Sequence, residues 1–280
     1  MRAGSPLDRP LRSKGTYVDG DEQRSEAGSS RSGRLDGKVA LVTGGVRRIG
    51  RATALALASA GASVVINARS SREEAEATAR EVETLGVSAM VHLADVTDEQ
   101  AVASMVEMIM DRFGRIDILI NNAAVRRESP FASMTYAEWR EIMAIILDGA
   151  FLCARAVVPH MVRQGSGRIV NIGGVSAHTG AMERAHVAAA KAGITGLTRA
   201  LAVEFATAGI TVNCIAPGRI GGKRSATSGA GLSLPHGAGP IVPREGTPED
   251  VAEVVLTVCG PAGGFITGQT IHVNGGMFLG

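Results

Sequence analysis

Residues 39–50 read VALVTGGVRRIG, and this stretch decides the fold class. The short apolar run Val39–Val42 leads into a glycine-rich turn, and helical apolar spacing follows at about residues 48–60. Glycines in such a turn let the backbone approach a pyrophosphate, whose charge is stabilised at the N-terminus of the next helix. The stretch therefore predicts a dinucleotide-binding strand–turn–helix unit. The full Gly-x-Gly-x-x-Gly pattern is absent, so an ordinary glycine-rich connection is the alternative.

Outward from this stretch, short apolar runs alternate with amphipathic or alanine-rich segments. Strands are predicted at 39–42, 63–66, 90–93, 116–120, 168–172, 211–215 and 270–273, and helices at about 48–60, 72–85, 98–112, 138–162, 183–207 and 248–258. Strands that are apolar on both faces and alternate with helices are typical of a parallel sheet covered on both sides. The sequence therefore predicts an α/β fold with a doubly wound parallel sheet of about seven strands.

Two segments interrupt this alternation. Residues 1–34 are rich in Arg, Ser, Gly, Asp and Glu without an apolar period, and we expect a disordered leader there. A mitochondrial targeting peptide is the alternative, against which five acidic residues argue. Residues 218–246 are rich in Gly, Ser and Pro and are longer than an ordinary connection, which predicts an active-site lid. Residues 35–280 are predicted to form a single domain that includes this lid.

Composition and charge exclude several classes of protein. The first 34 residues hold seven of the 29 basic and five of the 27 acidic residues, which leaves 22 of each sign in the body. A balanced body does not predict a nucleic-acid surface, although clustering of charge keeps that class as a distant alternative. Three widely spaced cysteines without a CxxC pair predict neither disulfides nor a metal site, and favour a cytoplasmic location.

No membrane span is predicted either. The longest approach to an apolar span, residues 142–158, is interrupted by Asp148 and Arg155. It therefore reads as a buried helix of a soluble protein, because a span needs about 18 or more nearly continuous apolar residues.

The second predicted strand indicates which dinucleotide binds. Arg69 follows that strand, 19 residues beyond Gly50, where an acidic residue would bind the ribose hydroxyls of NAD. An arginine there favours the 2′-phosphate of NADP, and Arg47 and Arg48 add positive charge nearby. Solvated loop arginines are the alternative. The three arginines together predict NADP(H) as the cofactor.

Five motifs together give the chain, over about residues 35–280, a resemblance to the short-chain dehydrogenase/reductase family. They are Thr43-Gly44…Gly50, Asp95-Val96, Asn121-Asn122-Ala123, Pro217-Gly218 and the closing Gly268-Gln269…Val273-Asn274-Gly275-Gly276. The chain looks like the β-ketoacyl-carrier-protein reductases of that family. The resemblance implies a single Rossmann-type domain that assembles as a dimer or tetramer. Arg48 resembles the arginine of pteridine reductases, which favours NADPH and gives slight support to a pterin-like substrate.

The resemblance also implies which residues hold the cofactor. Asp95 would lie by the adenine, and Asn121 and Ala123 would lie along the cofactor. The full expected set is Thr43, Gly44, Gly45, Arg47, Arg48, Ile49, Gly50, Arg69, Asp95, Val96, Asn121, Ala123, Lys191, Pro217 and Gly218.

Family members carry an Asn–Ser–Tyr–Lys catalytic tetrad, and most of it is absent here. The neighbouring motifs place the lysine at Lys191, whereas Val187, Gly174 and Ile146 stand at the positions of Tyr, Ser and Asn. The threonine that would hold the nicotinamide carboxamide is replaced by Gly222. The resemblance implies that Lys191 anchors the ribose.

Four residues are candidates for the missing proton chemistry. Ser176 and His178 lie on the loop expected to cover the nicotinamide, and His186 neighbours Val187. Surface exposure or packing is the alternative for both histidines. Lys191 itself could donate a proton if burial lowered its pKa.

The energetics of this loss suggest a substrate class. A positioned general acid contributes about 10²–10⁴-fold, so its removal weakens ketone reduction without abolishing hydride transfer. When hydride adds to the carbon of an iminium group, the product is a neutral amine, so no oxyanion has to be stabilised. The sequence therefore predicts an NADP(H)-dependent oxidoreductase with a divergent active site, acting on a small carbonyl or imine-like molecule. The alternative is a catalytically silent cofactor-binding subunit that acts as a scaffold or regulator.

We also expect a homo-oligomer. The predicted helices at 138–162 and 183–207 carry more apolar surface than one sheet face covers, and in the family they form a four-helix subunit interface. A small-molecule substrate is the other predicted partner, with no nucleic acid and no membrane.

Overall fold

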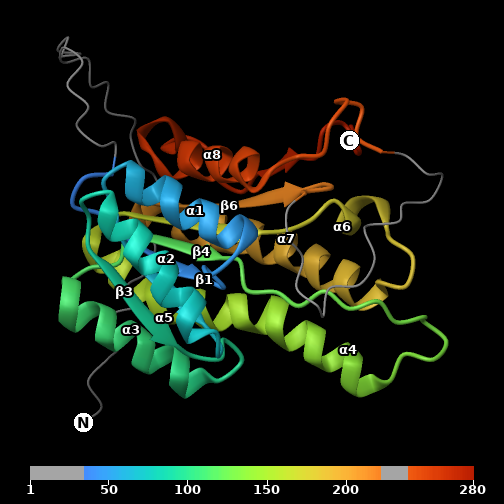
Figure 1. Ribbon diagram of the computed structural model, residues 1–280, viewed down its shortest axis with the longest axis horizontal. Helices are drawn as coiled ribbons and strands as arrows, with labels where there is room; N and C mark the ends of the chain where they lie inside the picture. The colour runs from blue at the N-terminus through green and yellow to red at the C-terminus, as the bar shows by residue number, and fades with distance from the viewer. Residues whose placement is uncertain (1–34, 222–238) are drawn as a thin grey trace. The chain divides into compact units, whose positions relative to one another are not determined.

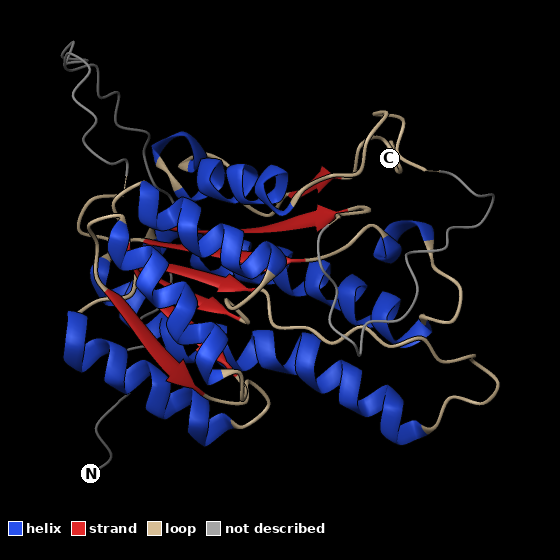
Figure 2. Ribbon diagram, in the orientation of Figure 1, coloured by secondary structure: helices blue, strands red, loops and turns tan. Residues whose placement is uncertain are grey.

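A computed structural model describes residues 35–221 and 239–280, which form a sheet layered between helices (Figures 1 and 2). The predicted leader, 1–34, and most of the predicted lid lie outside the described residues.

The sheet has seven strands in the order β3-β2-β1-β4-β5-β6-β7, and every neighbouring pair is parallel. The strands are β1 Val39–Thr43, β2 Ser63–Ala68, β3 Ala89–Leu93, β4 Ile118–Asn121, β5 Gly167–Ile172, β6 Ile210–Pro217 and β7 Thr270–Val273. The order reverses between β1 and β4, and ligands of open α/β sheets bind at the carboxyl ends of strands at such a switch point. The predicted fold class is confirmed.

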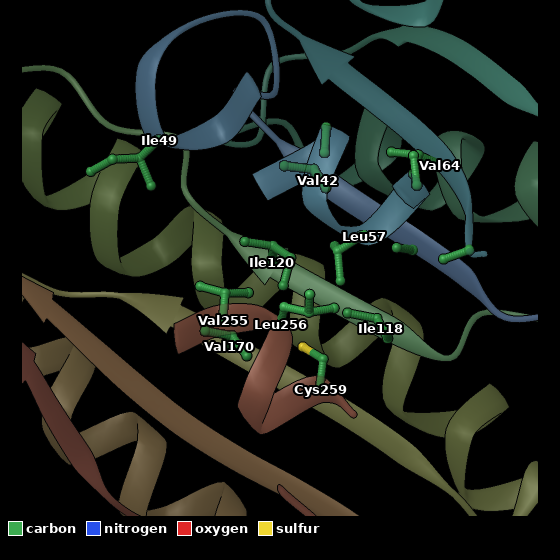
Figure 3. Packing of buried hydrophobic residues seen from close by; sticks show 14 of the residues in the cluster. Val42, Ile49, Leu57, Val64, Ile118, Ile120, Val170, Val255, Leu256 and Cys259 are labelled. Atoms are coloured by element: carbon green, nitrogen blue, oxygen red, sulfur yellow. The ribbon is translucent and has the colours of Figure 1, made fainter. Parts of the chain in front are cut away.

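Helices cover both faces of the sheet (Figure 2). They are α1 Arg48–Ser59, α2 Arg72–Thr84, α3 Glu99–Phe113, α4 Tyr136–Met143, α5 Gly149–Gln164, α6 Ser176–Thr179, α7 Ala185–Phe205 and α8 Pro248–Cys259. Alternate side chains of β1 enter opposite layers: Val42 belongs to one buried cluster with Leu57 of α1 and Val255 of α8 (Figure 3), and Leu41 to another with Val157 of α5. This alternation explains why the strands are apolar throughout.

The predicted helix at 138–162 is divided. A π-helical turn, Ala144–Asp148, separates α4 from α5. The apolar pattern runs through this turn without a break, so the sequence carries no sign of it. Such π-turns often occur at functional sites.

The continuous segment Tyr136–Gln164 is long and apolar enough to cross a membrane by length and composition. Its inner side chains, among them Cys153, Val157 and Met161, pack in the core beneath the sheet. The segment is therefore accounted for as a core helix of the α/β fold.

Candidate active site

The turn after β1 leaves no room for a side chain at Gly44 or Gly50. Gly44 has a φ of 61°, a left-handed conformation that glycine adopts without strain. A Cβ added to Gly50 would lie 2.2 Å from the Gly44 carbonyl oxygen and 2.6 Å from Asn122 Nδ2. Asn122 Nδ2 donates to the carbonyls of Thr43 and Gly44, at 2.9 Å each. Asn122 thus fixes the turn, and glycines in such a turn let the backbone approach a pyrophosphate closely.

Thr43 connects this turn to β4 across the switch point. Its hydroxyl donates to the Ile120 carbonyl (3.2 Å) and accepts from the backbone N–H groups of Asn122 (2.9 Å) and Ala123 (3.0 Å). Because one hydroxyl satisfies three backbone groups, the carboxyl ends of β1 and β4 keep a fixed separation.

Buried polar side chains form a series of hydrogen bonds from β4 through β5 to α7. Asn121 Nδ2 donates to Asn171 Oδ1 (2.8 Å), and Asn171 Nδ2 donates to the hydroxyl of Thr198 (2.9 Å). Asn121 Oδ1 is buried and has no hydrogen-bond partner among the described residues. A buried acceptor without a partner is costly, which fits a site that a polar ligand completes.

A small chamber opens beside Asn121. Its lining comes from β1, β4, β5, the π-turn, α5 and α7, together with the segment after β3. The lining residues are Thr43, Val96, Asn121, Ala123, Ile145, Ile146, Gly149, Ala150, Ile172, Lys191 and Ile194. Five of the residues expected to hold the cofactor therefore surround one space: Thr43, Val96, Asn121, Ala123 and Lys191.

Lys191 supplies the only ammonium group among the lining residues of this chamber. The side chain is buried, and Nζ donates to the Ile172 carbonyl. The pKa of Lys191 is lowered to about 8, mainly because burial removes water from the charged form; the positive charge of Arg126 acts in the same direction and Cys214 in the opposite one. The amine therefore still carries its proton at neutral pH and loses it just above.

The positions that the resemblance assigns to Asn and Tyr are apolar and belong to one cluster. Ile146 and Val187 belong to one buried cluster with Ile142 and Ile194. Ile146 lies within the π-turn, so the backbone irregularity is present at a position that offers no polar side chain. At Gly174, an added Cβ would have only Ser176 Oγ within 4 Å, at 3.8 Å, so there is room for a larger residue.

The three other candidates for proton chemistry do not line the chamber. Ser176 is buried at the start of α6. His178 packs against His272 and Phe278, with ring centroids at 4.6 and 5.2 Å, and burial lowers its pKa. His186 is completely buried, neither ring nitrogen has a partner within the described chain, and burial lowers its pKa.

The two arginines of the turn are both engaged. Arg47 Nη2 lies 3.0 Å from Glu74 Oε2 and 3.2 Å from the Ser71 hydroxyl. Arg48 has a φ of 50° and donates to the Ile220 carbonyl at 2.8 Å, which joins the turn to the segment after β6. The sequence reasoning missed Glu74, because an acidic residue in the first turn of a helix has no pattern that assigns it to an arginine.

The remaining residues expected to hold the cofactor lie near the carboxyl ends of the strands. Arg69 is exposed just beyond β2. Asp95 accepts from the backbone N–H and hydroxyl of Thr97, which fixes the turn after β3. Gly45 follows β1, and its N–H donates to the Asn67 carbonyl at the end of β2. Ile49 is buried in the first turn of α1. Pro217 ends β6, and the N–H of the next residue, Gly218, donates to the Val273 carbonyl.

A parallel sheet in this strand order, with a glycine turn at its switch point, is the arrangement of the Rossmann-type α/β proteins. A family model described as "Enoyl-(Acyl carrier protein) reductase" matches residues 44–278. A 3-oxoacyl-(acyl-carrier-protein) reductase of Synechocystis sp. is 40% identical over 248 residues, covering 88% of this chain and 98% of the relative. The chain belongs to the short-chain dehydrogenase/reductase family of oxidoreductases.

Further comparisons agree. A 3-oxoacyl-(acyl-carrier-protein) reductase of Staphylococcus aureus is 39% identical over 244 residues, covering 86% of this chain and 98% of the relative. The crystal structure of an acetoin dehydrogenase from Salmonella typhimurium superposes with a TM-score of 0.76 at 35% identity, covering 86% of this chain and 95% of that one. The predicted family resemblance is thus confirmed over nearly the whole length of these proteins.

Proposed function

We propose that this protein is an NADP(H)-dependent oxidoreductase with a divergent active site, which reduces a small carbonyl or imine-like molecule. The observation that carries the proposal is the coexistence of a close-packed glycine turn with Lys191, which lines a chamber together with Ile146; Ile146 in turn packs in one buried cluster with Val187. The cofactor side is kept, whereas the groups that move the proton are replaced.

The residues present fit a phosphorylated dinucleotide. The turn at Gly44 and Gly50 accommodates the pyrophosphate, and Arg47 and Arg69 lie at the end of β2 where a 2′-phosphate would come. Lys191 would hold the nicotinamide ribose. A bound nicotinamide supplies the hydride, and the protein orients it and excludes water.

The apolar wall favours a substrate that needs no strong general acid. Reduction of a ketone develops an alkoxide, and a positioned donor to that oxygen is worth about 10²–10⁴-fold. Gly174, Val187 and Ile146 offer no such donor. Reduction of an iminium gives a neutral amine, so the same wall imposes no comparable loss.

The test uses the purified full chain with NADPH and two acceptors of matched shape, a cyclic N-methyl iminium and the corresponding cyclic ketone. We expect a higher kcat/KM for the iminium. Faster turnover of the ketone contradicts the imine assignment, and failure to bind NADPH in calorimetry contradicts the oxidoreductase assignment itself.

The competing function is a silent cofactor-binding subunit. The close packing of Ile146 with Val187 favours it, because an apolar cluster stabilises the fold whether or not chemistry occurs. The double variant Val187→Tyr with Gly174→Ser separates the two cases. Ketone reduction gained by the variant, combined with iminium turnover by the wild type, supports the enzyme; NADPH uptake with no turnover of either acceptor supports the scaffold.

A further inference from the structure

The ion pair between Arg47 and Glu74 lies where the cofactor discriminates between NADP and NAD. Arg47 belongs to the turn between β1 and α1, and Glu74 to the first turn of α2. Their side chains are 45% and 50% exposed, and Ser71 Oγ accepts a second hydrogen bond from the same Nη2. The Glu74 carboxylate thus pairs with an exposed arginine of the glycine turn.

The position of this pair follows from the end of β2. Gly45 N donates to the Asn67 carbonyl (3.1 Å), so the turn abuts the last residues of that strand. The adenosine ribose of a dinucleotide lies at this place, outside the carboxyl end of the second strand. A 2′-phosphate there would lie among Arg47, Arg69 and Glu74.

We propose that Glu74 is a specificity-determining residue that opposes NADPH and thereby sets the ratio of NADPH to NADH affinity. The inference rests on the proposed use of a nicotinamide cofactor. The 2′-phosphate carries nearly two negative charges at neutral pH, so it competes with the Glu74 carboxylate for Arg47. An exposed ion pair contributes little to stability, so the guanidinium exchanges partners readily. The displaced carboxylate then remains near the phosphate and repels it.

The experiment compares Glu74→Gln with Glu73→Gln, which removes the same charge one residue earlier on the exposed side of α2. Dissociation constants for NADPH and NADH are measured by fluorescence titration without substrate, at low and high salt. We expect Glu74→Gln to bind NADPH about three- to tenfold more tightly, and the gain to shrink at high salt. Affinity for NADH should change less than about twofold, since it lacks the phosphate.

A second variant tests the pathway through the guanidinium. In Arg47→Ala, NADPH affinity should fall, and adding Glu74→Gln to it should change that affinity less than in the wild-type background. Both substitutions are at exposed positions, so thermal unfolding should be nearly unchanged and will verify the fold.

The remaining outcomes distinguish failure of this inference from failure of the proposed function. Unchanged or weaker NADPH binding in Glu74→Gln overturns the inference alone, as does an equal gain for both cofactors or for Glu73→Gln. A wild-type chain that binds neither cofactor overturns the proposed function, and the inference falls with it.

Discussion

Lys191 carries the positive charge of the chamber, and the protonation of its amine depends on pH. Its ammonium lies in a chamber that Thr43, Asn121 and several apolar residues line, and its pKa is lowered to about 8, mainly because the buried charged form loses hydration. The sign of the effect on stability follows: the folded protein binds this proton less tightly than the unfolded chain. Lys191 therefore costs folding free energy below about pH 8, and the cost disappears between that pH and its ordinary pKa of 10.5.

The same titration predicts opposite pH profiles for the two acceptors. At saturating NADPH, kcat/KM for a permanently charged iminium should rise about three- to tenfold from pH 7 to 9, because neutral Lys191 no longer repels it. For the matched ketone, kcat/KM should fall over the same range, because the proton donor is lost.

Lys191→Met is the control, and it should flatten both profiles without exchanging the order of the two substrates. An inflection near pH 8 that survives in Lys191→Met would assign the titration to another group.

At the scale of elements, the hydrophobic pattern predicted all seven strands and the six longer helices. Strand ends differ by a residue or two, since pairing on both sides decides where a strand stops: β6 extends to Ile210–Pro217 between β5 and β7. The π-turn at Ala144–Asp148 was not predicted, because it shifts hydrogen bonds without changing side-chain periodicity. The four residues of α6 are too few for a period to emerge.

The residues of the site, like the elements, were predicted only in part. Motif register assigned Lys191, Val187 and Ile146, and the structure places all three in or beside the chamber. The alignment of these positions with the family's motifs depends only on neighbouring residues in the sequence. The pairing of Arg47 with Glu74 depends on the path between two helices, and several other acidic residues on α2 were equally eligible from sequence.

One polar contact that stabilises the sheet lies at the edge opposite the site. Asp117 accepts hydrogen bonds from Arg115 (2.7 and 2.6 Å), Lys38 (3.1 Å) and the Val39 N–H (3.0 Å), which connects the start of β1 to β4. Burial of this carboxylate works against its charged form. The hydrogen bonds outweigh burial, and the pKa of Asp117 is held below its ordinary value.

Asp117→Asn should therefore lower the free energy of unfolding at pH 7 by about 1–3 kcal/mol, since the buried charge-assisted bonds are lost. A group with a lowered pKa stabilises the fold above its ordinary pKa, and that stability is lost as the pH falls through the folded value. The difference from wild type should accordingly shrink below about pH 4. Urea unfolding across this range measures it. Asp111→Asn, at an exposed position of α3, is the matched control, and an equal loss in that variant would contradict the assignment.

At the scale of the whole molecule, the two faces of the sheet are covered by different layers of helices. α1, α2 and α8 form one apolar layer with the sheet, and α3, α5 and α7 form the other. The second layer retains apolar side chains on its outer surface: Val203 of α7 is 83% exposed, and Phe151 of α5 is 44% exposed. Large apolar groups on neighbouring helices favour burial against another copy of the chain.

We expect the purified chain to be a homo-oligomer that uses these two helices. Val203→Asp should shift it toward a smaller species, because association through α5 and α7 would bury an uncompensated carboxylate. Leu85→Asp adds the same charge at the end of α2, on the opposite layer, and should leave the assembly unchanged. Size-exclusion chromatography with light scattering measures the mass, and NADPH titration verifies that each variant keeps its fold. A wild-type monomer, or dissociation by Leu85→Asp alone, would show that α5 and α7 are not the interface, and their exposed apolar side chains would then need another partner.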